Sequence, residues 1–466
     1  SGPDRGPDQP CVGAGRAGPV DAQGQDAPRR GLGPNRSVCR PQPGIHAAAI
    51  PGGPTIWDAL NIVADDADEL AYKPEQIAKH KKLVDEAGAL FGAYHFNHYD
   101  FLLAITDEMG GIGLEHQRSS ENQVEPGYFK DWDSDKALLD RNLLPHEFTH
   151  SWDGKFRRPD LLWTPDFRTP MQDNLLWVYE GQTQFWGYVL GARSGMFTKQ
   201  ETLDAYANIA ARLDTAVGRQ WRPLEDTTHD PIISARRPKG WSSWQRSEDY
   251  YNEGLMMWLE ADAIISKATR GRKGLDDFAK AFFGIKPGDW GQVVYNRDDV
   301  IATLNGIAPY DWAGFFQKYV DRPTGETPKG GFFMGGYKLV YTEEPNSFTK
   351  AAETAGKYVD QGSGIGAIVK NDGDISSVIW DSAAFKAGLV VGAKILAVNG
   401  NEFSPEDWKA AITAAKDGKT PIQIIVKQDK YYRTLSLAYS GGLRYPRLEK
   451  TGAGEGSLDR LLKPRT

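Results

Sequence analysis

Two histidines four residues apart, with a glutamate directly after the first, form the segment of this sequence best suited to chemistry. The segment reads His146-Glu147-Phe148-Thr149-His150. In a helix, positions i and i+4 lie on one face, so both imidazoles can bind a single ion. Glu147 lies on a neighbouring part of the helix surface, within reach of a water on that ion. Two zinc ligands and a general base are the working parts of the His-Glu-x-x-His motif. The segment therefore predicts a catalytic zinc site.

A third ligand is needed, because a tetrahedral catalytic zinc binds three protein side chains and keeps one position open. Glu180 is the candidate. It lies in an apolar, aromatic helical stretch over residues 176–183, where an unpaired carboxylate would be costly to bury. Binding a dication removes that cost. The alternative is that Glu180 pairs with Arg157 or Arg158.

Two further segments carry residues suited to peptide binding and catalysis. Residues 110–116 are rich in glycine, and glycines such as Gly113 permit close approach of a substrate backbone. Glu115 in the same segment offers a carboxylate for a free α-amino group. Tyr250 and Tyr251 open a long helix, where a tyrosine hydroxyl could stabilise the oxyanion of a tetrahedral intermediate. The alternatives are a structural turn with a surface glutamate and ordinary aromatic packing.

Stretches with helical periodicity surround these residues, and the helices that they predict must position them. The histidine motif lies in a predicted helix over residues 143–152, and Glu180 lies in a second over residues 174–190. A buried strand is predicted over residues 100–106, directly before the glycine-rich segment. Further helices are predicted over residues 73–90, 250–268, 275–283, 298–305 and 311–319. The middle of the chain is therefore expected to be mostly helical.

Changes in composition divide the chain of 466 residues into five segments. Residues 1–50 are rich in Gly, Pro, Arg and Gln without an apolar period, which predicts an unstructured or anomalous leader. Both cysteines, Cys11 and Cys39, lie in this leader and say little about the redox compartment. The other predicted segments are a catalytic domain (51–325), a connecting segment (326–356), a small domain of short strands and glycine turns (357–441) and a loose polar tail (442–466).

The overall composition excludes two classes of partner. A formal net charge of −7 and a pI near 5.7 argue against nucleic-acid binding, which requires a clustered basic face. No run of about 18 apolar residues occurs, so no membrane span is expected. The chain begins with serine rather than methionine, so we expect its native start, and any signal peptide with it, to be missing.

Several motifs together resemble one known family. They are Gly-Leu-Glu-His at 113–116, His-Glu-Phe-Thr-His-Ser-Trp at 146–152, Lys-Phe-Arg-Arg-Pro at 155–159, Trp-Val-Tyr-Glu-Gly at 177–181 and Tyr-Tyr at 250–251. Over residues 55–438 the chain resembles the glycyl aminopeptidase family, PDZ-containing gluzincin metallopeptidases distantly similar to aminopeptidase N. The resemblance implies a multidomain α+β protein. Its catalytic domain would be mostly helical and thermolysin-like (gluzincin), followed by a small β-rich PDZ domain.

The resemblance also assigns roles to individual residues. It implies that Glu115 recognises the substrate amine, that Glu180 is the third zinc ligand and that Tyr251 is the catalytic tyrosine. Three departures are visible. Glu253 stands where the aminopeptidase N group has a lysine, and the interval from His150 to Glu180 is longer than in that group. The leader replaces most of the N-terminal β-domain that the family usually carries.

The last domain resembles a PDZ domain. Gly364, Ile365 and Gly366 fit the carboxylate-binding loop, whose backbone N–H groups can receive a peptide C-terminus while a strand adds to the sheet edge. Two positions depart from the usual pattern, since Ala383 replaces a proline and Ala393 replaces an aspartate. The alternative is a packing module that only braces the catalytic domain.

The combined prediction is a zinc-dependent aminopeptidase with one zinc ion. It would hydrolyse N-terminal residues of peptides, glycine or alanine by resemblance, through a zinc-bound water with Glu147 as general base. Two alternatives stay open: an endopeptidase, in which Glu115 is structural, and a catalytically dead scaffold that binds peptides through its PDZ domain. Glu147 argues against the scaffold, which has no physical need for a general base. Family members are often exported, which favours a periplasmic or secreted location and leaves the cytoplasm open.

Overall fold

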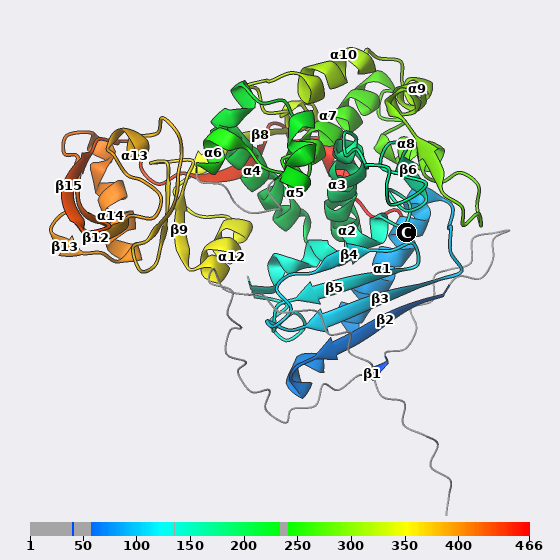
Figure 1. The fold of residues 1–466 in the computed structure, drawn as a ribbon, viewed down its shortest axis with the longest axis horizontal. Coiled ribbons are helices and arrows are strands. Elements are labelled where there is room, and N and C mark those ends of the chain that lie inside the picture. The colour runs from blue at the N-terminus through cyan, green and yellow to red at the C-terminus, as the bar shows by residue number, and fades with distance from the viewer. Residues whose placement is uncertain (1–39, 42–56, 135, 234–240) are drawn as a thin grey trace, which may run out of the picture. The chain divides into compact units, whose positions relative to one another are not determined.

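A mixed sheet begins the fold in the computed structural model, which describes residues 40–41, 57–134, 136–233 and 241–466 (Figure 1). In this described part the strand order is β1-β2-β3-β5-β4. Strands β2 (Trp57–Ala64), β3 (His98–Ile105) and β5 (Ser119–Val124) run parallel. Strand β4 (Gly113–Glu115) pairs antiparallel with β5 and forms one edge of the sheet.

The other edge of the sheet contains residues from the leader, which was predicted to be unstructured, so part of that prediction was wrong. Strand β1 (Arg40–Pro41) lies within residues 1–50 but pairs antiparallel with β2, opposite Asn61 and Ile62. Backbone hydrogen bonds to β2 therefore hold a short part of the segment that was predicted to be unstructured. The rest of that segment, with Cys11 and Cys39, lies outside the described residues.

Strand β3 and helix α1 (Pro74–Phe91) confirm two sequence predictions. Tyr99, Phe101, Leu103 and Ile105 alternate toward the core, which is the period expected of a strand with one buried face. The helix begins at Pro74, whose missing N–H costs nothing in a first turn, and it ends before Gly92, whose φ of 71° suits glycine.

Helices form the larger part of the main body and share one hydrophobic core with the sheet (Figure 1). The site is carried by α2 (Leu143–Thr149), α3 (Leu176–Ser194), α4 (Lys199–Thr215) and α7 (Asn252–Ala268). Helix α3 contacts α1, α2 and α7, so it lies at the centre of the bundle. The body also contains the α-helices α5 (Asp230–Ile233), α6 (Ser242–Gln245), α8 (Leu275–Phe282), α9 (Arg297–Ile307), α10 (Trp312–Phe316) and α11 (Gly330–Gly335), and the short strands β6 (Arg157–Pro159) and β7 (Val293–Tyr295).

Residues 357–441 form a C-terminal module with a hydrophobic core of its own, drawn in yellow to red-orange in Figure 1. One sheet has the order β11-β10-β9 and another has the order β13-β12-β14-β15. The elements are β9 (Tyr358–Gln361), β10 (Ala367–Lys370), β11 (Ile375–Val378), α13 (Ala383–Lys386), β12 (Lys394–Val398), β13 (Asn401–Glu402), α14 (Pro405–Ala414), β14 (Ile422–Gln428) and β15 (Tyr431–Leu437).

The predicted loose tail is instead part of the main body. Strand β16 (Tyr445–Lys450) pairs antiparallel with β8 (Tyr337–Thr342), and helix α15 (Ser457–Leu461) follows. Leu448, Leu458, Leu461 and Leu462 belong to the main hydrophobic core. The tail prediction was wrong because a polar average composition conceals these few well-spaced leucines. The connecting segment also contains helix α12 (Ser347–Gly356).

Removing residues 442–466 is therefore expected to unfold the main body. Replacing one buried leucine by alanine costs about 2–5 kcal/mol, and the deletion removes four, against a typical total stability of about 5–15 kcal/mol. Thermal unfolding followed by circular dichroism provides the measurement. In a matched control variant a Gly-Ser linker replaces residues 358–441; it should retain cooperative unfolding, since the module has its own core. A truncated protein that melts like the full chain would contradict the structure.

None of the helices in the described residues has the length and apolar character that crossing a bilayer requires.

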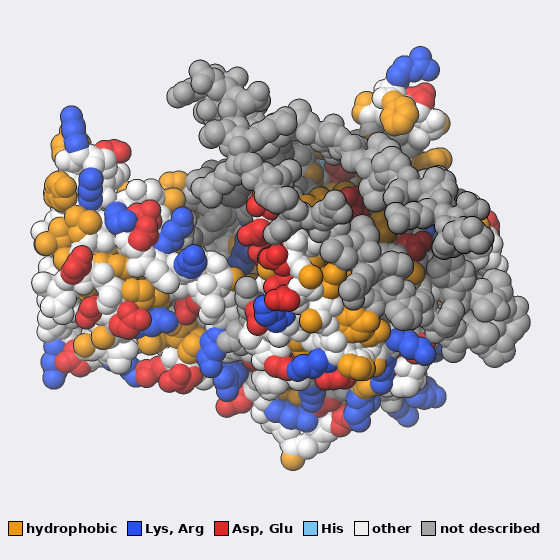
Figure 2. Space-filling model, turned by 90° about the horizontal axis from the view of Figure 1, so that it is seen from below, with side chains coloured by type: hydrophobic (Ala, Val, Ile, Leu, Met, Phe, Trp, Pro, Cys, Tyr) orange, Lys and Arg blue, Asp and Glu red, His pale blue; other side chains and the backbone are white. Residues whose placement is uncertain are grey.

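The side of the molecule seen from below carries acidic, basic and apolar side chains in mixture over its described surface (Figure 2). Lys and Arg do not gather there into one continuous face.

Candidate active site

Three buried side chains converge at the junction of α2 and α3. His146 lies in α2, and His150 follows the end of the helix but keeps helical backbone angles (φ −60°, ψ −20°). The Nε2 atoms of the two histidines lie 3.2 Å apart, and Oε2 of Glu180 lies 3.4 Å and 3.3 Å from them. Tetrahedral coordination at the usual zinc distance of about 2.0–2.1 Å would place the donor atoms about 3.4 Å apart. The cluster therefore fits one zinc ion.

The surroundings of Glu180 favour a metal ligand over an arginine partner. Within the described residues its buried Oε2 accepts no hydrogen bond, and the two imidazoles face it. Arg157 instead lies over the ring of Phe282 at 4.2 Å, and Arg158 donates to the backbone oxygen of Gly154. The alternative that Glu180 pairs with one of these arginines therefore finds no support in the contacts.

Electrostatics at the cluster require positive charge between the donors. Burial alone would raise the pKa of Glu180, but the charge of His150 and the close approach of both imidazoles hold it below its ordinary value. Burial likewise would lower the pKa of His150, but the charge of Glu180 raises it to about 10. The carboxylate thus stays ionised only beside a cationic neighbour, and a bound dication would satisfy the same demand.

Each histidine has a hydrogen-bond partner on its outer nitrogen. Nδ1 of His146 lies 3.0 Å from Oε1 of Gln184, and Nδ1 of His150 lies 2.9 Å from the backbone oxygen of Asp153. Donation from Nδ1 leaves Nε2 of both rings free for a metal. Sequence reasoning missed Gln184, although it lies four residues after Glu180 and so shares its helix face.

Glu147 lies next to the three donors and beneath the edge strand. Its buried Oε2 has no hydrogen-bond partner among the described residues, and burial raises the pKa of the carboxyl group. A Cβ added at Gly113 would overlap Oε1 of Glu147 and the side chain of Leu143. Gly113 was predicted to allow close approach of a substrate. The structure shows that this glycine first allows β4 to approach Glu147.

Glu115 has two side-chain partners that the sequence did not reveal. Its Oε1 accepts a hydrogen bond of 2.6 Å from the hydroxyl of Tyr179 and lies 3.2 Å from Nζ of Lys155. Burial alone would raise the pKa of Glu115, but the charges of His150 and Lys155 lower it to about 2. Glu115 is therefore an ionised, half-buried carboxylate beside the metal cluster rather than a surface residue in a turn.

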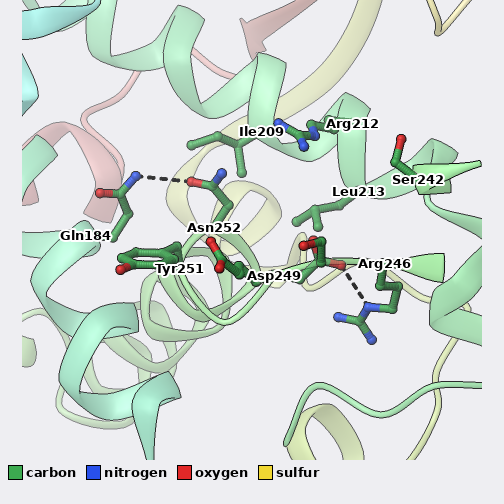
Figure 3. Close-up of a pocket in the computed structure, with 11 residues that line it drawn as sticks. Gln184, Ile209, Arg212, Leu213, Ser242, Arg246, Asp249, Tyr251 and Asn252 are labelled. Atoms are coloured by element: carbon green, nitrogen blue, oxygen red, sulfur yellow. Dashed lines mark hydrogen bonds and ion pairs between the residues drawn. The ribbon is translucent and has the colours of Figure 1, made fainter. Parts of the chain in front are cut away.

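The two tyrosines before α7 occupy different environments. Tyr250 is fully buried in the core. Tyr251 is only partly buried, and its ring centroid lies 6.1 Å from that of His146. Tyr251 also lines a cavity of about 420 Å³ together with Gln184 and Asn252 (Figure 3). The structure therefore brings Tyr251 to the metal cluster and leaves Tyr250 in a packing role.

The part of the chain that carries the site is similar to one known protein family. Residues 140–257, which contain all three metal donors, match the model of the M61 glycyl aminopeptidases. Residues 140–257 are thus similar to the M61 peptidases. With the buried His-His-Glu cluster, this M61 region makes the chain a metallopeptidase with a site for one zinc ion. The resemblance to glycyl aminopeptidases seen in the sequence is confirmed.

One solved structure resembles the chain well beyond residues 140–257. An aminopeptidase N family protein from Idiomarina loihiensis has a TM-score of 0.70 at 18% identity, over 92% of this chain and 71% of that one. An M1 zinc metallopeptidase from Deinococcus radiodurans gives 0.39 at 16% identity, over 62% of this chain and 52% of that one. No curated protein is significantly similar to the chain. The mixed fold of helices and sheet thus resembles that of aminopeptidase N family proteins.

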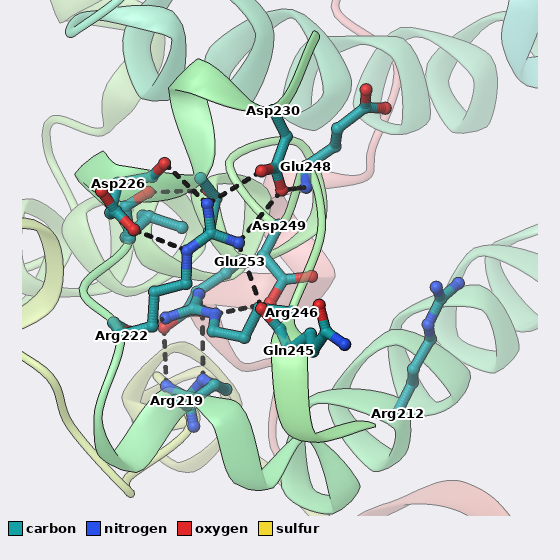
Figure 4. A network of polar contacts seen from close by, with 12 residues as sticks. Arg212, Arg219, Arg222, Asp226, Asp230, Gln245, Arg246, Glu248, Asp249 and Glu253 are labelled. Carbon is teal, nitrogen blue, oxygen red and sulfur yellow. Dashed lines mark hydrogen bonds and ion pairs between the residues drawn. The ribbon is translucent and has the colours of Figure 1, made fainter. Parts of the chain in front are cut away.

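The glutamate that replaces the expected lysine lies in a buried ionic network of the M61 region (Figure 4). Arg219 donates to Oε1 of Glu253 at 2.6 Å and to Oε2 at 3.0 Å, and Arg246 also pairs with this carboxylate. Glu253 is completely buried, and such a carboxylate is tolerable only with paired cations. The pairing of Glu253 with Arg219 and Arg246 therefore explains the glutamate at this position.

The predicted peptide-binding loop lies in the C-terminal module and is not part of the metal cluster. Ile365 is fully buried in the module's core, and a Cβ at Gly366 (φ 87°) would overlap Ser382. Strand β10, which follows the loop, pairs with β9 on one side and β11 on the other. A peptide strand beside this loop would therefore have to replace β9.

Proposed function

We propose that the chain is a zinc-dependent aminopeptidase that releases N-terminal residues from peptides. The observation that carries this proposal is the position of Glu115, an ionised carboxylate on the edge strand beside a cluster suited to zinc. His146, His150 and Glu180 would hold the ion. When bound, the ion supplies a Lewis acid that polarises the scissile carbonyl and acidifies water.

Glu147 is proposed as the general base. Its Oε2 is buried without a hydrogen-bond donor from the described residues, so a water placed there can give its proton to this atom. The same carboxyl group can then pass the proton to the leaving amine. Tyr251, which lines the neighbouring cavity, would donate a hydrogen bond to the developing oxyanion.

Strand β4 supports the positioning of an extended peptide. Within the described sheet it pairs only with β5, so its second edge leaves backbone groups of residues 113–115 for a substrate strand. Glu115 ends this strand. A peptide that pairs along the edge would thus bring its first residue toward the carboxylate.

The α-ammonium group of the substrate must share Glu115 with Lys155. Within the described residues Tyr179 and Lys155 both contact Oε1, so Oε2 is left for the ammonium group. The same ion pair favours the second candidate, an endopeptidase: if Lys155 already satisfies Glu115, this carboxylate only shapes the cleft. The inactive-scaffold alternative does not explain why a carboxylate without a donor is buried at Glu147.

Glu115→Gln separates the two peptidase candidates. The amide can still accept the hydrogen bond from Tyr179 but carries no charge. A charge-assisted bond to the substrate ammonium is worth about 1.5–3 kcal/mol, so kcat/KM for free-amine peptides should fall about ten- to a hundredfold. N-acetylated peptides carry no such charge and should lose little.

The measurement compares both substrate types on both proteins, with zinc content determined in parallel. Glu108→Gln removes an exposed carboxylate from the loop before β4 and serves as the matched control. An equal loss for acetylated and free-amine peptides would favour the endopeptidase, in which Glu115 is structural.

The C-terminal module is proposed to be a PDZ domain that binds peptide C-termini at Gly364, Ile365 and Gly366. The order of strands and helices after the loop supports this assignment. Because β9 occupies the edge of β10, binding by strand addition requires that β9 first detaches. The preferred first residue of the substrate, glycine or alanine, rests on the family resemblance.

A further inference from the structure

A polar cavity next to Tyr251 contains an arginine that the ionic network does not use. One end of the cavity is lined by Gln184, Tyr251 and Asn252. This end lies beside the metal cluster, since Gln184 also contacts His146. Arg212, in α4, projects over the same cavity (Figure 3). This side chain is exposed and also borders a neighbouring cleft of about 720 Å³. Its guanidinium is thus accessible to a ligand that extends away from the metal.

The other arginine of the cavity is already paired. Arg246 binds Asp249 at 2.7 Å and also pairs with Glu253. For Arg212, by contrast, no carboxylate of the described residues lies within the 4 Å of an ion pair, and Figure 4 shows it well apart from the network and from Glu248. Arg212 is therefore a cation available for an external anion.

The charge of Arg212 affects the pKa of one acidic residue of the C-terminal module, although the two residues form no ion pair. Burial raises the pKa of Asp360, and the charge of Arg212 counters part of that rise. Asp360 itself accepts a hydrogen bond of 2.8 Å from the backbone N–H of Gly362. Asp360 and Arg212 do not approach within the 4 Å of an ion pair, so the guanidinium of Arg212 stays open to a ligand.

The cavity and Glu115 lie on different sides of the metal cluster. Tyr179, which binds Glu115, has its ring centroid 4.9 Å from that of His150. Tyr251, at the cavity, instead neighbours His146. A peptide whose amino end lies at Glu115 would therefore extend across the metal toward the cavity.

We propose that Arg212 binds a carboxylate of the peptide substrate, and that this carboxylate is the C-terminus of a short peptide. The inference rests on the proposed aminopeptidase function. A guanidinium stays charged at all physiological pH values and can bind a carboxylate through two parallel N–H groups. An extended chain spans only about 3.3–3.6 Å per residue, so only short peptides would place their C-terminus at Arg212 while the first residue stays at Glu115. The site would thereby recognise both ends of its substrate.

Peptide binding to the zinc-loaded Glu147→Gln protein tests this subsite without turnover. The probes are Gly-Ala-Ala, its C-terminal amide, and Gly-Ala-Glu as a C-terminal amide, with Kd measured by calorimetry. Because Arg212 is exposed, the free acid should bind about three- to tenfold more tightly than the amide, and added salt should reduce the difference. Introducing Arg212→Gln should remove the preference. Arg447→Gln, which neutralises an exposed arginine outside both cavities, should keep it.

Each outcome decides the proposal. Equal Kd values for acid and amide, or a preference that survives Arg212→Gln, would overturn it. If the Gly-Ala-Glu amide regains the affinity lost by the Gly-Ala-Ala amide, the carboxylate is a side chain and the C-terminal assignment is wrong. If the unaltered zinc-loaded protein hydrolyses none of these peptides but the carboxylate preference persists, the proposed aminopeptidase function fails and the subsite stands.

Discussion

Zinc-loaded Glu147→Gln should turn over peptides at least about 10²–10⁴-fold more slowly than the unaltered protein, the range expected for loss of a general base. The amide has nearly the same shape as the carboxylate, so the close packing against Gly113 and Leu143 should persist. It cannot accept the proton, however. Glu147 is not one of the three converging donors, so zinc content should not change.

Steady-state rates and metal content, determined on the same preparation, check this expectation. Glu108→Gln is again the matched control, because it replaces an exposed carboxylate with the same amide. Near-normal turnover in a metal-replete Glu147→Gln protein would exclude Glu147 as the base. Loss of zinc together with activity would instead assign Glu147 a role in metal binding.

Glu180→Ala should produce the largest loss of zinc affinity. The substitution removes one of three donors and exposes the two histidines to additional water. Loss of the hydrogen-bond partner of a metal-bound histidine, such as Gln184, usually lowers metal affinity about 10–100-fold. Loss of a direct ligand should exceed that range.

Competition with a chelator of known affinity would give the order of zinc binding. We expect affinity to decrease from Glu147→Gln to Gln184→Ala and then to Glu180→Ala. Gln184→Ala is the matched control, because it changes the same face of α3 one turn away without touching a donor atom. Equal metal content in Glu180→Ala and unaltered protein after dialysis would mean that another residue is the third ligand.

Local sequence patterns predicted that His146 and His150 lie together, because a helix places residues four apart on one face whatever surrounds it. The same rule predicted α1 and α7 nearly to their ends. Helix α2 is shorter than predicted and stops at Thr149, yet His150 keeps the helical angles that the motif needs. Strand β2 escaped prediction because Asp58 and Asn61 interrupt its apolar pattern, although Asp58 is fully buried.

Contacts between distant segments were beyond the reach of such patterns. Lys155 meets Glu115 forty residues away, and Arg219 meets Glu253 across a similar interval. Both pairs form only when the tertiary fold brings their elements together. The strand partner of β8 likewise lies about a hundred residues later, so the composition of residues 442–466 alone could not identify it.

The pairing of β8 with β16 sets an order of events during synthesis. As the chain leaves the ribosome, residues 57–356 emerge first, followed by the C-terminal module, which can fold on its own core. The core leucines of β16 and α15 emerge after the module. The nascent main body therefore lacks this strand and helix until the whole module has been synthesised. The metal donors of α2 and α3, although made early, belong to a body whose core is complete only after residues 445–462 have left the ribosome.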